Sequence, residues 1–246
     1  FKKSDNKTDE GWLSLSDMMT VLMVIFLTIA IFVSFSSPQS SRAAQLVKNE
    51  EILCENFKRK ISFDLRQEIE VKCNPFRVIF LRPDTQFAIG RSEIRRPFKD
   101  ILNKFIPIYI SHLAEWDNRE FISEIRVEGH ASPIGPYIGN LKLSQDRSFN
   151  VSRYIVEEVV PENYGLTKMP SVESIIGNEN NKTIEKWTRE KMTASGFSFM
   201  KPKYKSSNNF ISKEVDNPAS QRVEVRLHVN YAGVISALDN RVLQLN

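Results

Sequence analysis

The chain has few of the residues that most enzyme centres require. It contains two cysteines, three histidines and nine glycines among 246 residues. The histidines are His112, His130 and His228, and they show no metal-ligand spacing with one another or with the cysteines. The few glycines do not form a glycine-rich phosphate-binding loop. Glu128 and His130 would share one strand face, but no nucleophile accompanies them. The sequence predicts neither an enzyme nor a bound cofactor or metal ion.

Long apolar runs are also few, and a single run in the sequence is long enough to span a membrane. No charged residue occurs between Met18 and Phe35. The polar residues in this run are Thr20, Thr28 and Ser34. This composition predicts a transmembrane helix over residues 12–35. The run lacks an obvious small-residue cleavage site, so we expect a retained anchor, and because Phe1 is not methionine we expect a start residue before it.

Asp17 stands at the head of the apolar run. An ionised carboxylate facing lipid costs about 2.5–3.5 kcal/mol, so an acid at this depth faces a partner or water and commonly handles protons. At about 100° per residue, Ser14 and Thr28 share a helix face with Asp17, and Thr20 lies at its edge. Two interpretations stay open: a proton carrier with Thr20 and Thr28 lining its path, and an interfacial acid stabilised by the helix dipole.

The distribution of charge bears on the orientation of the predicted transmembrane helix and on the partners of the chain. Lys2, Lys3 and Lys7 precede the apolar run, and Arg42 and Lys48 follow it, which weakly favours a cytoplasmic N-terminus. The net charge of +4 allows attraction to anionic polymers. No basic block or aromatic-interleaved basic motif is present, so we expect no direct contact with nucleic acid.

The patterns divide the chain into five segments. They are a cytoplasmic tail (1–11), the transmembrane helix (12–35), a periplasmic linker helix (36–73), an α+β domain (74–230) and a C-terminal helix (231–246). The linker begins with a break at 36–41, after which apolar residues recur at helical spacing over 42–69.

The domain alternates strands and helices. We expect strands at 76–81, 121–128, 191–197 and 222–229, helices at 97–113 and 144–160, and an irregular segment at 163–188. This pattern predicts a mixed sheet with two helices on one face.

Cys54 and Cys73 both follow the apolar run. An even pair outside the cytoplasm predicts a disulfide that would staple the linker helix to the domain, and two unpaired buried thiols are the alternative.

The stretch Trp12-Leu13-Ser14-Leu15-Ser16-Asp17-Met18-Met19-Thr20 resembles the transmembrane signature of the MotB family of ion-driven stator subunits. The family's proton-accepting aspartate falls on Asp17. The resemblance implies a homodimer whose helices lie inside a pentameric ring of polytopic A subunits in the inner membrane.

Two later stretches resemble the peptidoglycan-binding domain of the OmpA C-terminal family. The first is Val127-Glu128-Gly129-His130-Ala131-Ser132, which is followed by Gly135, Asn140 and Leu143-Ser144-Gln145-Asp146-Arg147. The second is Ser220-Gln221-Arg222-Val223-Glu224-Val225. The resemblance covers roughly residues 76–230, and it implies an OmpA-like fold and a periplasmic wall-binding role.

The same resemblance implies the site. Arg147, expected at a helix start, would bind a carboxylate of diaminopimelate bidentately, helped by the helix's free N–H groups. Asn140 and Leu143 would shape the pocket, and Arg222 would line it. Ser132 stands where the family has an ammonium-binding aspartate. A serine brings no charge, so we expect weaker or altered binding of diaminopimelate. The alternative for Arg147 is a surface residue of a helix capped by Ser144.

The order of tail, acid-bearing helix, linker and wall-binding domain resembles the B subunit of a proton-driven motor. Among such subunits, the stretch from Met18 to Leu27 is most similar to those of the Zorya anti-phage defence systems. A flagellar stator subunit and a passive wall tether without ion coupling are the alternatives.

Overall fold

The structure is a computed structural model of the chain. It describes the backbone of residues 9–35, 38–117, 119–164, 183–207 and 210–230, and the side chains of residues 18–32, 47–117, 119–164, 183–205 and 214–230. The chain divides into two compact units, Phe1–Leu46 and Val47–Asn246.

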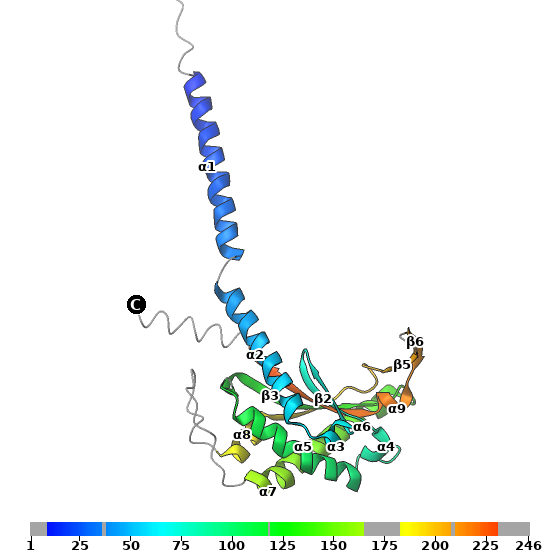
Figure 1. Cartoon of the computed structure of the whole chain (residues 1–246). Coiled ribbons are helices and arrows are strands. Elements are labelled where there is room, and N and C mark those ends of the chain that lie inside the picture. Colours follow the sequence, from blue (N-terminus) through cyan, green and yellow to red (C-terminus); the bar gives the residue numbers. More distant parts are fainter. Residues whose placement is uncertain (1–8, 36–37, 118, 165–182, 208–209, 231–246) are drawn as a thin grey trace, which may run out of the picture. The chain divides into compact units, whose positions relative to one another are not determined.

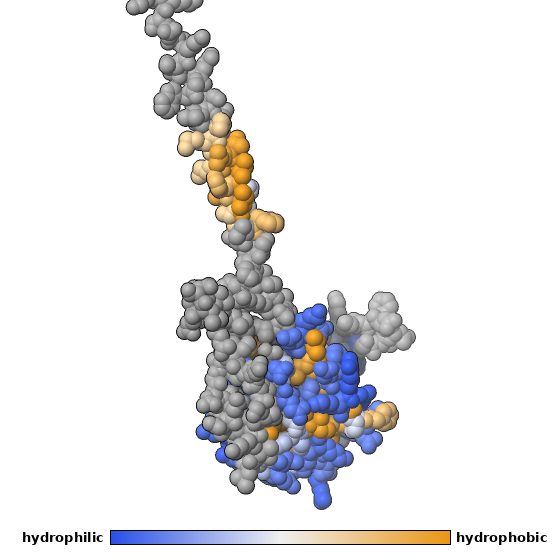
Figure 2. Space-filling view, turned by 60° about the vertical axis from the view of Figure 1, so that its left-hand side comes forward, coloured by the Kyte–Doolittle hydropathy of each residue, from blue (hydrophilic) through white to orange (hydrophobic). Residues whose placement is uncertain are grey.

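The first unit contains helix α1 (Asp9–Phe35). From Met18 to Phe32 all of its large apolar side chains are exposed, and they form the hydrophobic segment seen in Figure 2. In the part of the chain that the structure describes, no helix combines the length and apolar character needed to cross a membrane.

The helix expected over 42–69 is shorter than the periodicity predicted. Helix α2 (Pro38–Lys60) ends before Ser62, which caps the short helix α3 (Phe63–Arg66). Strand β1 (Ile69–Cys73) then pairs with the next strand. The prediction of helix up to Ile69 was wrong, because Ile69 and Val71 alternate toward the core and pairing within the sheet outweighs helical spacing. The sheet thus begins inside the segment expected to be a linker.

The second unit is built on a five-stranded mixed sheet (Figure 1). Besides β1 it contains β2 (Phe76–Phe80), β3 (Ile122–His130), β4 (Met192–Gly196) and β7 (Arg222–Val229). The order is β1-β2-β7-β3-β4, and only β3 and β4 run parallel. The four strands predicted from the sequence are confirmed, and so is the mixed sheet.

The two faces of the sheet differ in chemistry. Val78, Val225 and Val127 lie opposite one another on β2, β7 and β3, and all three are buried. This apolar face packs against helices α5 (Arg96–Ala114) and α6 (Tyr137–Tyr154), which lie together on one side of the sheet in Figure 1. The alternate residues are mainly charged and point to the opposite face, which none of the described helices covers in Figure 1 and which we call the helix-free face. The α+β fold with helices on one face is confirmed.

Helix α6 begins earlier than predicted. Its first residue is Tyr137, seven positions before the expected start at Ser144, and it continues through η2 (Ile155–Val159) into α7 (Val160–Tyr164). Pro136 occupies the N-cap and its fixed φ favours a helix start at the next residue. The expected start was wrong, because Gly139 and the polar residues near it hid the first two turns from a pattern based on apolar spacing.

The remaining elements are short. They are α4 (Pro83–Gln86), η1 (Arg119–Phe121), α8 (Ile184–Lys191), β5 (Tyr204–Ser207), β6 (Phe210–Val215) and α9 (Asn217–Ser220). Helix α8, capped by Thr183, begins within the segment expected to be irregular (163–188) and extends past its end to Lys191. The helix predicted at 231–246 lies outside the described residues.

Cys54 and Cys73 form a disulfide, with Cα atoms 5.4 Å apart. The disulfide predicted from the sequence is confirmed, and it joins α2 to β1.

Candidate functional site

Two glycines bring helix α6 against the ends of strands β3 and β4. A Cβ atom on Gly129 would lie 2.1 Å from the carbonyl oxygen of Ser144, and one on Gly196 would lie 2.4 Å from the nitrogen of Gln145. The Gln145 side chain accepts a hydrogen bond from the Gly196 N–H at 2.7 Å. This close approach fixes the turn of α6 that precedes Arg147.

Arg147 lies in the middle of α6 and is buried. Its Nε donates to the carbonyl oxygen of Arg91 at 3.0 Å, and its guanidinium carbon lies 4.9 Å from the ring centroid of Phe87. Burial lowers the pKa of Arg147 to about 10. Among the described residues, no carboxylate lies within ion-pair distance of it. Arg147 is thus a desolvated cation held by a carbonyl group and an aromatic ring.

Two sequence-based interpretations of Arg147 need correction. It does not open a helix, so the free N–H groups of a helix terminus cannot assist it. The alternative of a surface residue on a helix capped by Ser144 is also wrong. Ser144 is an internal residue of α6, and its Oγ accepts a hydrogen bond from the Ser198 N–H at 2.9 Å.

Asn140 and Leu143 precede Arg147 on the same helix. Asn140 is buried, and its Nδ2 donates to the carbonyl oxygen of Ile134 at 2.9 Å. It thereby holds the loop between β3 and α6. Leu143 is half-buried.

Ser132 lies next to Gln221, the residue that precedes β7. Ser132 is buried, and its hydroxyl accepts a hydrogen bond from Gln221 Nε2 at 3.4 Å. The neighbouring Arg222 is also buried, and its Nε donates to Glu224 at 2.6 Å. Its guanidinium further donates to the carbonyl oxygen of Lys201 at 3.2 Å. Arg222 is thus paired with a carboxylate of the protein, unlike Arg147.

The segment Phe197–Lys203, here called the strap, joins these parts. The carbonyl oxygen of Ser198 accepts from the Ala131 N–H at 2.7 Å, and its hydroxyl donates to the Tyr137 carbonyl oxygen at 3.1 Å. The strap therefore connects the end of β3 with the start of α6, where Ser132 and Asn140 lie.

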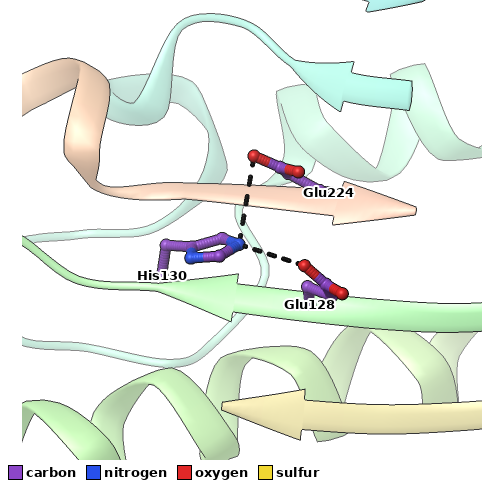
Figure 3. Close-up of side chains that lie close together, drawn as sticks. All are labelled: Glu128, His130 and Glu224. Atoms are coloured by element: carbon purple, nitrogen blue, oxygen red, sulfur yellow. Dashed lines mark ion pairs between the residues drawn. The ribbon is translucent and has the colours of Figure 1, made fainter. Parts of the chain in front are cut away.

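A buried ionic cluster lies beneath the strap on the helix-free face. Figure 3 shows Glu128 and His130 on β3 facing Glu224 on β7. His130 Nε2 lies 3.6 Å from Glu128 and 3.9 Å from Glu224, distances too long for hydrogen bonds. The ring of His130 stacks on Phe197. His130 is the last residue of β3, and neither of its ring nitrogens has a hydrogen-bond partner among the described residues.

The three donor atoms of this cluster lie within 4.8 Å of one another, so a metal ion has to be considered. Lys201 lies 3.5 Å and Arg226 3.4 Å from Glu128. Arg222 and Arg77 flank Glu224. These cations already outnumber the two carboxylates, and a divalent ion would add charge of the same sign in a buried space. We therefore assign no metal ion to the cluster.

The same cations set the protonation states. Burial alone raises the pKa of Glu128, but His130, Arg226 and Lys201 lower it to about 2. The pKa of Glu224 is lowered as well, because Arg222 and His130 outweigh the effect of burial. Burial and the charge of Arg222 lower the pKa of His130, so its neutral form is favoured.

The candidate proton carrier Asp17 and the residues expected beside its path, Thr20 and Thr28, belong to α1. The side chain of Asp17 lies outside the described residues. Thr28 donates its hydroxyl to the carbonyl oxygen of Ile25 at 2.8 Å, a bond within the helix. Thr20 is exposed on the same helix.

Sequence reasoning did not identify the partners of Arg147. Phe87 and Arg91 come from a loop that contacts α6 only in the folded chain. The strap was also missed, because its role depends on backbone groups that carry no sequence signal.

No family model matches the chain. Among solved structures, the cell wall anchor of the T6SS from Pseudomonas aeruginosa is 19% identical, covers 67% of this chain and 90% of its own, and has a TM-score of 0.39. The periplasmic domain of MotB is 14% identical, covers 68% of this chain and 71% of its own, and has a TM-score of 0.34.

Two curated proteins are similar over most of the chain. Zorya protein ZorB of Escherichia coli strain ATCC 8739 is 28% identical over 82% of this chain and 81% of its own length. Zorya protein ZorB of Escherichia coli O139:H28 strain E24377A is 25% identical over 92% of this chain and 83% of its own length. The resemblance predicted from the motifs is confirmed: the chain is similar to the ZorB proteins of Zorya systems.

Proposed function

We propose that this chain is the B subunit of a proton-driven inner-membrane complex in anti-phage defence, and that its second unit anchors the complex to peptidoglycan. Similarity to the ZorB proteins over 82% and 92% of the chain supports the defence role. The wall-binding role rests on one observation, the buried guanidinium of Arg147 with no carboxylate partner among the described residues.

A carboxylate is the ligand that Arg147 fits best. A buried cation without an anion carries an uncompensated desolvation cost, which an incoming carboxylate would offset. Guanidinium and carboxylate groups match in a bidentate geometry. Nε already donates to the carbonyl oxygen of Arg91, so the two terminal nitrogens remain to face the ligand. The carboxylates of peptidoglycan stem peptides supply this chemistry.

The other site residues support this contact in different ways. Asn140 holds the loop after β3, Leu143 supplies apolar surface, and Ser132 offers a hydroxyl. Arg222 supports the site from β7 through its bonds to Glu224 and the strap.

Pull-down on purified sacculi tests this proposal. Arg147→Ala removes a charge-assisted contact worth about 1.5–3 kcal/mol, so retention should fall roughly tenfold to 150-fold. Arg153→Ala is the matched control, because Arg153 lies on the same helix and is exposed. Equal retention of wild type, Arg147→Ala and Arg153→Ala would exclude Arg147 as the wall contact.

We further propose that residues 12–35 span the inner membrane with the N-terminus in the cytoplasm, and that Asp17 carries the proton. The exposed apolar side chains of α1 suit a lipid environment. In a dry helix bundle the neutral acid is favoured, because desolvation disfavours the charged form. Contact with water or a partner hydroxyl favours proton release. Alternation between these environments would make the carboxylate a proton relay, with Thr20 and Thr28 beside its path.

The proposed assembly is a homodimer inside a ring of polytopic A subunits. Asp17→Asn keeps the side-chain shape but never ionises, so the variant should co-purify with the A subunit and lose phage protection. A variant that assembles and protects normally would show that Asp17 is not a proton carrier and would favour the passive wall tether. If loss of the protein abolishes swimming and leaves phage sensitivity unchanged, the flagellar alternative replaces the defence role.

A further inference from the structure

The helix-free face of the sheet carries four cations in register across four strands. Lys72 on β1 lies opposite Arg77 on β2, Arg77 lies opposite Arg226 on β7, and Arg226 lies opposite Arg126 on β3. We call these residues the cationic row. With strands about 4.8 Å apart, the row extends over about 14 Å. Like charges directly opposite one another destabilise a sheet, and neighbouring carboxylates on the same face offset this repulsion within the fold.

A carboxylate lies next to each cation of the row: Glu70 beside Lys72, Glu224 beside Arg77, Glu128 beside Arg226 and Glu124 beside Arg126. Glu224 lies 3.6 Å from Arg77, and Glu128 lies 3.4 Å from Arg226, and both acids are buried. The side chains of the row keep 38% exposure at Lys72, 28% at Arg126, 25% at Arg77 and 18% at Arg226. Arg77 and Arg226 are therefore partly exposed above buried acids, whereas Lys72 and Arg126 pair with the solvent-accessible Glu70 and Glu124.

The charge of this face is positive in sum. The row together with Arg222, Lys201 and Lys203 supplies seven positive charges, and the acids of the face are Glu70, Glu124, Glu128 and Glu224. Three bases lie close enough to these cations for their pKa values to be affected. Burial lowers the pKa of Lys203, His228 and His130, and nearby cations lower it further. These cations are Arg222 and Lys72 for Lys203, Arg126 and Arg226 for His228, and Arg222 for His130.

We propose that this face is a second anion-binding surface, and that its occupant is the carboxylate-bearing polymer of the cell wall. The inference rests on the proposed wall-binding function. Guanidinium groups suit carboxylates, and a polymer that places one carboxylate at Arg147 carries others along its length. Once the first is bound, the second contact is intramolecular, and effective concentration makes even weak charge pairs add to retention.

The test uses the full-length protein in detergent, with purified sacculi as the probe. The row variant, Lys72→Gln combined with Lys203→Gln, removes one positive charge of the row and one of the adjacent strap. Neither lysine has an ion pair with Glu128 or Glu224 among the described residues. The matched control is Lys58→Gln combined with Lys60→Gln. Lys58 is 38% exposed and pairs with Glu55, as Lys72 is 38% exposed and pairs with Glu70.

The row variant should be retained about threefold to tenfold less than wild type, as expected for two exposed charge contacts, and the control should match wild type. Raising salt from about 0.1 to about 1 M should remove the difference, because the screening length falls from about 10 to about 3 Å.

Each other outcome has a defined meaning. Equal retention of the row variant and wild type, or equal loss in the control, overturns the inference. So does lysine-dependent binding to phosphatidylglycerol vesicles with unchanged retention on sacculi, because the occupant is then a lipid. The Arg147→Ala variant separates the two proposals. If sacculi retain this variant as they retain wild type, the proposed wall contact at Arg147 is wrong. If sacculi retain Arg147→Ala less than wild type but retain the row variant normally, only the proposed second surface is wrong.

Discussion

Glu128 on β3 lies directly opposite Glu224 on β7, and both carboxylates are buried. Two like charges in this position would repel each other. His130 stands between them, and arginine and lysine side chains flank both acids. The pair is therefore stable only as part of a charged network that joins β2, β7, β3 and the strap. Disturbing the network should affect folding and the loop that holds Ser132.

The first prediction concerns pH. The pKa of His130 is lowered in the folded protein, chiefly by burial, whereas an unfolded histidine titrates near 6.5. As pH falls below about 6.5, the unfolded chain therefore takes up a proton that the folded chain does not, and stability falls. His112 and His228 act in the same direction. His130→Gln should make the urea midpoint less dependent on pH between about 7.5 and about 5.

An unchanged pH slope in His130→Gln would contradict this prediction. The carboxylates act in a lower window. The pKa values of Glu128 and Glu224 are lowered in the folded state, so their contribution is present above their unfolded pKa and is lost as pH falls below about 4.3.

The second prediction concerns the contact between α6 and the sheet. Gly129→Ala would place a Cβ atom 2.1 Å from the Ser144 carbonyl oxygen, so α6 must move and stability should fall by about 1–3 kcal/mol. Gly139→Ala is the control, because its Cβ would meet only Pro136 at 3.5 Å, and alanine in a helix should leave stability unchanged or raise it by up to about 1 kcal/mol. Thermal unfolding measures both, and similar melting temperatures would refute the tight packing.

The third prediction concerns the disulfide. Cys54 and Cys73 are 19 residues apart in the sequence, and a closed loop of about this size stabilises a fold by about 3 kcal/mol. Replacing both by serine should lower the free energy of unfolding by about that amount. Wild type unfolded in urea with a reductant should match the variant. Identical midpoints for the oxidised wild type and the variant would show that the bridge does not contribute.

The fourth prediction concerns ligand choice. Ser132→Asp adds a negative charge beside Gln221 and should strengthen binding to sacculi about tenfold, because a ligand ammonium gains a charged partner. Ser132→Asn has a similar shape without the charge and should bind as wild type does. The prediction fails if the two variants are retained equally.

Local patterns alone determined much of this protein. Alternation of apolar and charged residues in Arg222–Val229 predicted both the strand and its two faces, because side chains in a strand point to opposite sides. The compartment implied by the apolar run predicted the bond between Cys54 and Cys73. The stretch from Met18 to Leu27, together with the order of the motifs, predicted the similarity to the ZorB proteins.

Only the tertiary structure decided what depends on contacts between distant segments. The sheet begins at Ile69 because pairing with β2 outweighs helical spacing. Arg147 is buried because Gly129 and Gly196 let α6 approach β3 and β4, and because Phe87 covers the guanidinium. The cationic row exists only through strand register, since Lys72 and Arg226 are far apart in the sequence. Register and close packing are properties of the assembled sheet, and no local window of residues contains them.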